Sequence, residues 1–277
     1  MKRFHDAVVW ITGGGTGIGR ALALAFAREG ARVVVSGRRP EPLDEVVAEV
    51  TSLGREGLAA VCDVTDESQI DDTLAQLLAR FGRLDVVVAN AGFCVNGRVE
   101  RLSAADWRRQ LDTNVVGAAV TASKCLPALR HTRGRVVFVA SVAGNVTYPG
   151  GAAYAASKFA LRAIGLTLGM ELHGSGVTCT TIHPGLVESD IGKTDNLAVF
   201  KPEREDPRPT TFMWPAERAA RVMLGAIYRR QREVVVTGHG KLGAFLGRHL
   251  PGVTCFFMER AGVEKMAHFA DQLGDRR

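Results

Sequence analysis

The chain has 277 residues, of which 46% are hydrophobic and 23% are charged, so it can fill a sizeable core. Its length suits one large α/β domain or two small ones. The formal net charge is +6, but no block of lysine and arginine interleaved with aromatic residues accompanies it. We therefore expect no nucleic-acid partner, although a local need for positive charge, such as a phosphate-bearing ligand, stays open.

The five cysteines stand at positions 62, 94, 125, 179 and 255. Their number is odd and none forms a C-x-x-C pair, which argues against a disulfide framework or a zinc site and for a reducing compartment. The first residues run directly into a strand pattern without the long apolar run of a signal peptide, and no segment reaches membrane-spanning length. We expect a cytoplasmic protein without a metal site.

Short apolar runs of strand type alternate with amphipathic helical patterns along the chain. The strands are predicted at residues 7–12, 32–36, 58–62, 84–90, 135–140, 177–182 and 233–237. The helices are predicted at residues 18–29, 42–53, 68–81 (capped by Ser68), 107–129, 154–173 and 216–230. This alternation is typical of βαβ units around a parallel sheet with helices on both faces, a doubly wound α/β domain.

Two segments stand outside the alternation. Residues 187–215 are rich in proline and charge and are predicted to form a long loop or short helices, included in a domain of residues 1–240. Residues 241–277 are predicted to form a short helical extension, broken at Pro251-Gly252, that packs on the same domain or on a partner subunit. Its apolar face with Lys241, Arg248 and Arg260 also fits peripheral contact with a membrane, which we favour less because the apolar stripe is short.

A glycine-rich turn follows the first strand and opens the first helix. Gly13, Gly17 and Gly19 let the backbone turn tightly and approach a pyrophosphate, whose charge would lie at the helix N-terminus. The second strand ends in Ser36-Gly37-Arg38-Arg39, where an acidic residue would bind the adenosine ribose hydroxyls. Arg38 instead offers a guanidinium suited to a 2′-phosphate, so the sequence favours NADP(H) over NAD(H).

Residues Ser141, Tyr154 and Lys158 carry the candidate chemistry. Tyr-x-x-x-Lys on a helix places both side chains on one face, one turn apart. An ammonium beside the phenol is expected to lower the pKa of Tyr154 from its ordinary value, which suits proton transfer, and Ser141 offers a donor to a carbonyl oxygen. Asn114 lies within a predicted helix, where asparagine is a poor helix former, and indicates a local kink or a functional role.

Taken together and in chain order, TGGGTGIG at residues 12–19, Asn90-Ala91-Gly92, Asn114, Ser141, Tyr154-x-x-x-Lys158 and Pro184-Gly185 resemble the short-chain dehydrogenase/reductase family, in its short single-domain branch. The resemblance covers residues 5–240. It implies a Rossmann-like seven-stranded sheet and hydride transfer between NAD(P) and an alcohol or carbonyl. Two positions depart from the family pattern: Ser189 replaces the usual threonine, and Ala89 stands where many members have asparagine.

The resemblance also implies residue roles. Tyr154 would be the general acid/base, Lys158 would lower its pKa and hold the nicotinamide ribose, Ser141 would bind the substrate oxygen, and Asn114 would fix a water in a proton relay. The expected cofactor contacts are Gly13, Thr16, Gly17, Ile18, Gly19, Arg38, Arg39, Asp63, Val64, Asn90, Ala91, Gly92, Tyr154, Lys158, Pro184, Gly185, Val187 and Ser189.

The substrate side is predicted to be apolar. Besides Ser141 and Tyr154, the expected contacts are Phe93, Val146 and Tyr148, which suit a bulky steroid-, lipid- or aromatic-like substrate, although apolar residues here equally suit packing of the loop. The resemblance implies a homodimer or homotetramer. The alternative to an enzyme is a dinucleotide-binding sensor on the same fold; the presence of Ser141, Tyr154, Lys158 and Asn114 together favours the enzyme.

Overall fold

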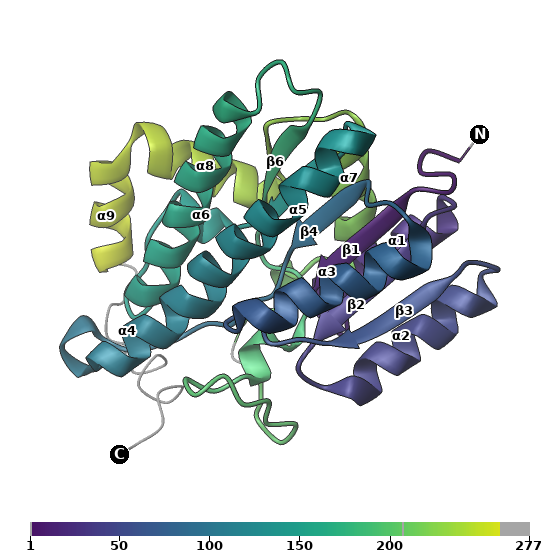
Figure 1. Ribbon diagram of the computed structural model, residues 1–277. Coiled ribbons are helices and arrows are strands. Elements are labelled where there is room, and N and C mark those ends of the chain that lie inside the picture. The colour runs from purple at the N-terminus through teal and green to yellow at the C-terminus, as the bar shows by residue number, and fades with distance from the viewer. Residues whose placement is uncertain (1, 207, 261–277) are drawn as a thin grey trace.

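Seven parallel strands form a single sheet in the computed structural model, which describes residues 2–206 and 208–260 (Figure 1). The strands are β1 (Val8–Thr12), β2 (Arg32–Gly37), β3 (Gly57–Val61), β4 (Val86–Ala89), β5 (Arg135–Val139), β6 (Thr178–His183) and β7 (Glu233–Val235). Their order is β3-β2-β1-β4-β5-β6-β7, and each neighbouring pair is parallel. The predicted doubly wound fold with seven strands is therefore confirmed.

Helices cover both faces of the sheet, because neighbouring residues on each strand point to opposite sides. Val9 and Ile11 of β1 pack in one core against α1 (Gly17–Arg28), α2 (Pro40–Ser52) and α7 (Ala216–Tyr228). Val8 and Trp10 pack in the other core against α3 (Glu67–Phe81), α5 (Ala118–Thr132) and α6 (Ala152–Glu171). All four of these β1 side chains are fully buried, which explains why the strand is apolar on both faces.

The strand order reverses direction at β1. From β1 the chain winds outward through β2 and β3, then returns to pair β4 on the other side of β1. A reversal of this kind leaves a crevice outside the carboxyl ends of β1 and β4, where ligands bind in open α/β sheets. The glycine-rich turn and Asn90-Ala91-Gly92 both lie at these ends.

Two local predictions were wrong. The helix expected at residues 107–129 is two helices, α4 (Ala104–Leu111) and α5, joined by a π-helical turn at Asp112–Gly117. The sequence analysis also missed the start of α4, where Ser103 and Asp106 form a reciprocal capping box. Helix α3 is capped by Asp66 rather than Ser68, because the Asp66 carboxylate accepts hydrogen bonds from both the backbone N–H and the hydroxyl of Ser68.

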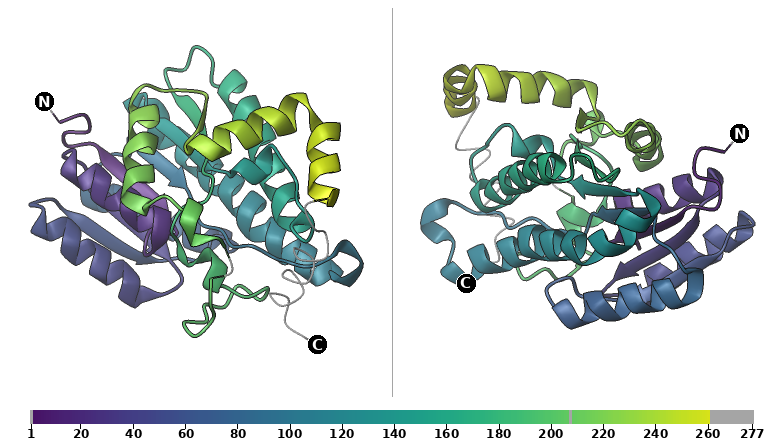
Figure 2. Two further views of the ribbon diagram at one scale, coloured as in Figure 1. Left: turned by 180° about the vertical axis from the view of Figure 1, so that it is seen from behind. Right: turned by 45° about the horizontal axis from the view of Figure 1, so that its top comes forward.

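The remaining segments lie outside the alternating pattern. The described part of residues 187–215 holds two short 3-10 turns, η4 (Asp190–Lys193) and η5 (Thr210–Phe212), with isolated β-bridges, and appears green in Figure 1. Helices α8 (Gly238–His249) and α9 (Pro251–Arg260) follow the sheet and lie together at one margin of the molecule (Figure 2). The part of the predicted extension beyond residue 260 lies outside the described residues. Within the described ranges, no helix is long and apolar enough to cross a membrane.

Candidate active site

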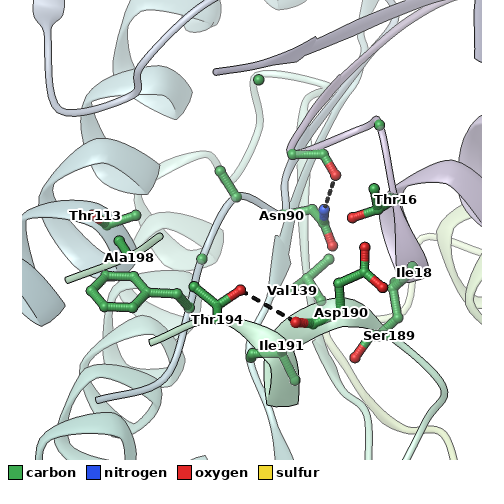
Figure 3. Close-up of a pocket in the computed structure, with 18 of the residues that line it drawn as sticks. Thr16, Ile18, Asn90, Thr113, Val139, Ser189, Asp190, Ile191, Thr194 and Ala198 are labelled. Atoms are coloured by element: carbon green, nitrogen blue, oxygen red, sulfur yellow. Dashed lines mark hydrogen bonds between the residues drawn. The ribbon is translucent and has the colours of Figure 1, made fainter. Parts of the chain in front are cut away.

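A pocket of about 600 Å³ lies at the carboxyl ends of the strands. Every residue that the sequence predicts to contact the cofactor lines it, together with Ser141 and Phe93. Figure 3 shows Thr16, Ile18 and Asn90 in this pocket, with Asp190 and Ser189, from the segment after β6, beside Ile18 and with Ile191 and Thr194 further along that segment. The fold thus brings the predicted binding residues to one place, whereas Asn114, Val146 and Tyr148 are not among its lining residues.

The glycine-rich turn leaves room only for hydrogen at its critical positions. Gly13 and Gly17 have φ of +61° and +51°, which L side chains rarely adopt. A Cβ added at Gly19 would lie 2.1 Å from the carbonyl oxygen of Gly13. Among the described residues no side chain caps the N-terminus of α1, and its first turn holds no acidic residue. This cradle of free N–H groups fits the pyrophosphate of a dinucleotide.

Asn90 and Thr12 hold the turn against the end of β4. The Thr12 hydroxyl oxygen accepts hydrogen bonds from the backbone N–H groups of Asn90 and Ala91, each at 3.0 Å. In return, Asn90 Nδ2 donates to the carbonyl oxygens of Thr12 at 2.9 Å and Gly13 at 3.0 Å (Figure 3). These bonds tie the two sides of the crevice together. None of them involves the side chain of residue 89, so the alanine that stands there in place of the family's asparagine removes none of them.

Both arginines that follow β2 face the pocket and also contact the segment 187–215. A guanidinium nitrogen of Arg38 donates a hydrogen bond to the carbonyl oxygen of Ala198. Arg39 lies over the ring of Phe200 at 4.4 Å from its centroid, and its Nη2 is 3.9 Å from Asp190 Oδ2. The segment therefore reaches across the groove to the end where an adenosine 2′-phosphate would lie.

Further hydrogen bonds hold this segment over the groove. Asn96 N donates to Asn196 Oδ1 at 2.9 Å, and Asn196 Nδ2 donates to the carbonyl oxygen of Asn96 at 2.8 Å. Arg208 donates to the carbonyl oxygens of Val187 at 3.1 Å and Ser189 at 2.8 Å. The sequence analysis missed Asn96, Asn196 and Arg208, because their partners lie 19 to 100 positions away in the chain and no local pattern announces them.

Ser141 is oriented toward Tyr154 by its own backbone turn. It precedes the 3-10 turn η3 (Val142–Gly144), and its hydroxyl oxygen accepts a hydrogen bond from the Ala143 N–H at 3.1 Å. The Ser141 hydroxyl lies near the Tyr154 phenol and lowers the pKa of Tyr154. Burial outweighs it and raises the pKa of Tyr154 well above its usual value.

Lys158 does not lower the pKa of Tyr154 as the sequence analysis expected. Burial lowers the pKa of Lys158 itself to about 8, and its Nζ donates to the carbonyl oxygen of Val139 at 3.0 Å. The Nζ lies over the Tyr154 ring, 5.5 Å from the centroid, rather than against the phenol oxygen. The expected effect was wrong because desolvation of the phenol dominates the pKa of Tyr154, and Lys158 does not offset it from its place over the ring.

Asn114 is fully buried in the π-helical turn and is bonded on all sides of its amide. Its Oδ1 accepts from the Phe93 N–H at 3.1 Å, while Nδ2 donates to the Phe93 carbonyl oxygen at 3.0 Å and to Ser157 Oγ at 3.1 Å. A Cβ added at Gly92 would lie 3.0 Å from Asn114 Oδ1 and 3.7 Å from Lys158 Nζ. The predicted local kink at Asn114 is confirmed, and the residue lies beside the lysine.

The predicted substrate residues lie in different surroundings. Phe93 has 2% of its surface exposed and packs in a small apolar cluster, and Val146 lies against α8. Burial raises the pKa of Tyr148 well above its usual value, and its hydroxyl is hydrogen-bonded to the thiol of Cys94. Burial also raises the pKa of Cys94 to about 12, so this cysteine is a neutral thiol near Tyr154. The sequence analysis treated Cys94 only as part of a cysteine count.

Comparisons with known proteins show the family of the chain. The family model described as short chain dehydrogenase matches residues 7–198. A serine 3-dehydrogenase of Agrobacterium fabrum is 33% identical over 80% of this chain and 92% of its own length, and a 3beta-hydroxysteroid dehydrogenase of Mediterraneibacter gnavus is 35% identical over 69% of this chain and 70% of its own length. A short-chain dehydrogenase/reductase of Burkholderia phymatum in complex with NAD has a TM-score of 0.80 at 26% identity, covering 89% of this chain and 94% of that one.

Proposed function

This chain belongs to the short-chain dehydrogenase/reductase family, and from that premise we propose that it is an NADP(H)-dependent oxidoreductase that interconverts a carbonyl and a secondary alcohol. The observation that carries the proposal is the Tyr154 hydroxyl, which meets the Ser141 hydroxyl in the pocket with Lys158 behind it. Membership of the family makes the chain an oxidoreductase acting on CH–OH or C=O groups with a nicotinamide cofactor. The preference for NADP(H) and the kind of substrate are our proposals.

The chemistry divides among these side chains. A nicotinamide supplies the hydride. Tyr154, kept protonated by its raised pKa, donates its proton to the carbonyl oxygen. Ser141, held by the Ala143 N–H, donates a hydrogen bond to the same oxygen and stabilises its developing charge. Lys158 lies behind both residues, and Asn114 lies beside it across Gly92, which supports the role of these two residues in proton delivery.

The residues after β2 support NADP(H). Ser36, Gly37, Arg38 and Arg39 include no carboxylate that would bind ribose hydroxyls and repel a phosphate. Arg38 and Arg39 both line the pocket at this end. A planar guanidinium binds a phosphate through two parallel hydrogen bonds, which suits a 2′-phosphate better than a neutral hydroxyl.

A bulky apolar substrate is supported by side chains near the catalytic end of the groove. Val187 and Ile191 line the pocket, and Leu197 and Phe212 on the same segment are 48% and 61% exposed. Tyr148 adds a hydroxyl close to Tyr154. Apolar walls with few polar groups select ligands by size and shape more than by charge.

The direct test is oxidation of NADPH, followed by absorbance, with steroid, fatty-acyl, aromatic and sugar carbonyls. We expect turnover with a steroid or aromatic ketone, and slower turnover when NADH replaces NADPH. Saturable binding of NADPH without turnover of any carbonyl would contradict an enzyme and favour a dinucleotide sensor. Turnover restricted to small polar carbonyls would contradict only the proposed substrate class.

We also propose that the protein forms a homodimer or homotetramer through α5 and α6. Val116, Phe159 and Met170, in and beside these helices, are 51%, 39% and 62% exposed. Large apolar side chains on a helix surface commonly mark an interface. Light scattering during gel filtration should give a mass of two or four chains, and a monomer at micromolar concentration would refute this assembly.

A further inference from the structure

A fully buried histidine stands directly behind the catalytic serine. His183 ends β6, and its side chain has no exposed surface. Its Nδ1 lies 3.0 Å from the carbonyl oxygen of Ser141 and 3.1 Å from Asn145 Nδ2. Its Nε2 lies 3.0 Å from Glu233 Oε1 at the start of β7. The chemistry of the active site uses neither His183 nor Glu233 directly.

Glu233 gathers charged side chains from three elements. Its Oε1 accepts from Arg162 Nε of α6 at 2.7 Å and from Arg248 Nη2 of α8 at 3.1 Å, in addition to facing His183 of β6. Desolvation of Glu233 is outweighed by these partners, so the pKa of its carboxyl is lowered and it is ionised at neutral pH. Because two arginines already neutralise the Glu233 carboxylate, it does little to stabilise a charged His183, and the imidazole is neutral.

The hydrogen bonds form a closed ring with defined directions. Arg248 Nε donates to Asn145 Oδ1 at 2.7 Å, which leaves Asn145 Nδ2 to donate to His183 Nδ1. A neutral imidazole that accepts at Nδ1 carries its proton on Nε2, where it donates to Glu233. Arg248 Nη2 donates to the same carboxylate and closes the ring. In this tautomer Nδ1 has no proton for the Ser141 carbonyl oxygen, which accepts instead from the Gly144 N–H at 2.9 Å. The ring therefore reaches the serine turn through Asn145, the residue that ends η3.

The ring encloses the turn that carries Ser141. Glycines of α8 let the helix backbone approach this turn: a Cβ added at Gly247 would lie 2.2 Å from the carbonyl oxygen of Asn145, and one at Gly240 would lie 2.8 Å from Val142 Cγ2. On the opposite side, a Cβ at Gly144 would lie 2.7 Å from the backbone oxygen of Lys158. The turn η3 is therefore held between α6 and α8 without room to shift.

We propose that Arg248, His183 and Glu233 form a positioning unit that holds Asn145 and with it the η3 turn after Ser141, so that helix α8 helps to orient the catalytic hydroxyl. This inference rests on the proposed function, because it assigns a task in that reaction to the helix that lies outside the strand–helix alternation. The Ser141 hydroxyl is aimed by a bond from Ala143 N within η3, and a looser η3 would lose that aim.

The test compares Glu233→Gln and Arg248→Ala with Lys241→Ala, a control on the exposed side of the same helix. Arg248→Lys keeps the charge and replaces the planar fork by a single ammonium, so it should give an intermediate result. Each variant is checked first for an unchanged melting temperature within a few degrees, and Glu233→Gln, which keeps the shape of the side chain, covers the case in which Arg248→Ala does not fold.

Two measurements decide the proposal. Amide hydrogen exchange of the peptide containing residues 141–146 needs no cofactor or turnover, and in Glu233→Gln and Arg248→Ala we expect it to be about tenfold faster, as for loss of a hydrogen bond to a charged group. Single-turnover hydride transfer with NADPH should slow by about tenfold in the same variants, while the dissociation constant for NADPH stays within about twofold. Lys241→Ala should match the wild-type chain in every measurement.

If residues 141–146 exchange their amide hydrogens at the wild-type rate in both variants, the proposal that the ring holds η3 is refuted. Faster amide exchange with an unchanged rate of hydride transfer would refute the positioning role, because it would show that a looser serine turn does not slow the reaction. If the wild-type chain turns over no carbonyl at all, the proposed function fails, and hydrogen exchange alone still decides whether the ring holds the serine turn.

Discussion

Arg38 offers the sharpest test of cofactor choice, because it already has a partner in the structure. Its guanidinium donates to the carbonyl oxygen of Ala198, which it would have to leave or share in order to bind a 2′-phosphate. A hydrogen bond between charged groups contributes about 1.5–3 kcal/mol, and one to a neutral acceptor about 0.5–1.5 kcal/mol. The difference is about 1.5 kcal/mol, which corresponds to roughly a tenfold change in the dissociation constant.

The variant Arg38→Ala should therefore bind NADPH about tenfold more weakly, whereas its affinity for NADH should change by less than about threefold. Both affinities are measured by quenching of protein fluorescence at one fixed salt concentration, because screening weakens phosphate contacts at an exposed site. Arg80→Ala, near the end of α3 and away from the pocket, is the matched control. Equal weakening of both cofactors would refute the reasoning, since it would show that Arg38 acts on the loop rather than on the phosphate.

Three further predictions follow from the site. Gly19→Ala would place a Cβ 2.1 Å from the Gly13 oxygen, so it should abolish NADPH binding in a fluorescence titration. The control Gly238→Ala has open space around the added Cβ and should bind NADPH normally. Normal binding by both variants would contradict the role of the glycine-rich turn in binding the pyrophosphate. Burial lowers the pKa of Lys158 to about 8 from 10.5, so between these pH values the unfolded chain binds more protons than the folded one. The free energy of unfolding of the wild type, measured by urea titration relative to Lys158→Met, should therefore rise from pH 8 toward pH 10. A difference that does not change with pH would show that the lysine is not desolvated. Tyr148→Phe should raise the KM for the carbonyl substrate and leave the NADPH dissociation constant unchanged, and an unchanged KM would place Tyr148 outside the substrate site.

Most of the fold and the cofactor groove were predictable because their signals are local. A buried parallel strand reads as a short apolar run, and the glycines of the first turn must stand where the chain reverses tightly. All predicted cofactor residues line one pocket because strand ends of a parallel sheet meet at one edge. The apolar runs marked seven strands and a doubly wound fold, and the family resemblance implied that all seven form one Rossmann-like sheet.

What the sequence could not predict depends on partners that are distant in the chain. The contacts of Arg38 with Ala198 and of Arg248 with Asn145 join residues 160 and 103 positions apart. The pKa of Tyr154 was misjudged for a related reason: spacing along a helix indicates that a lysine is near a tyrosine, but only the packed structure shows how strongly the phenol is desolvated. The break in the helix at Asn114 was suspected from propensity, although its π-helical form was not.

The central claim is that Tyr154 transfers the proton while a nicotinamide transfers the hydride. The most direct measurement compares the wild type with Tyr154→Phe in single-turnover oxidation of NADPH by a carbonyl that the wild type reduces. The variant should bind NADPH with an unchanged dissociation constant and lose hydride transfer by a factor of about 10³ or more, since the positioned proton donor is removed. A phenylalanine variant that still transfers hydride near the wild-type rate would contradict the account.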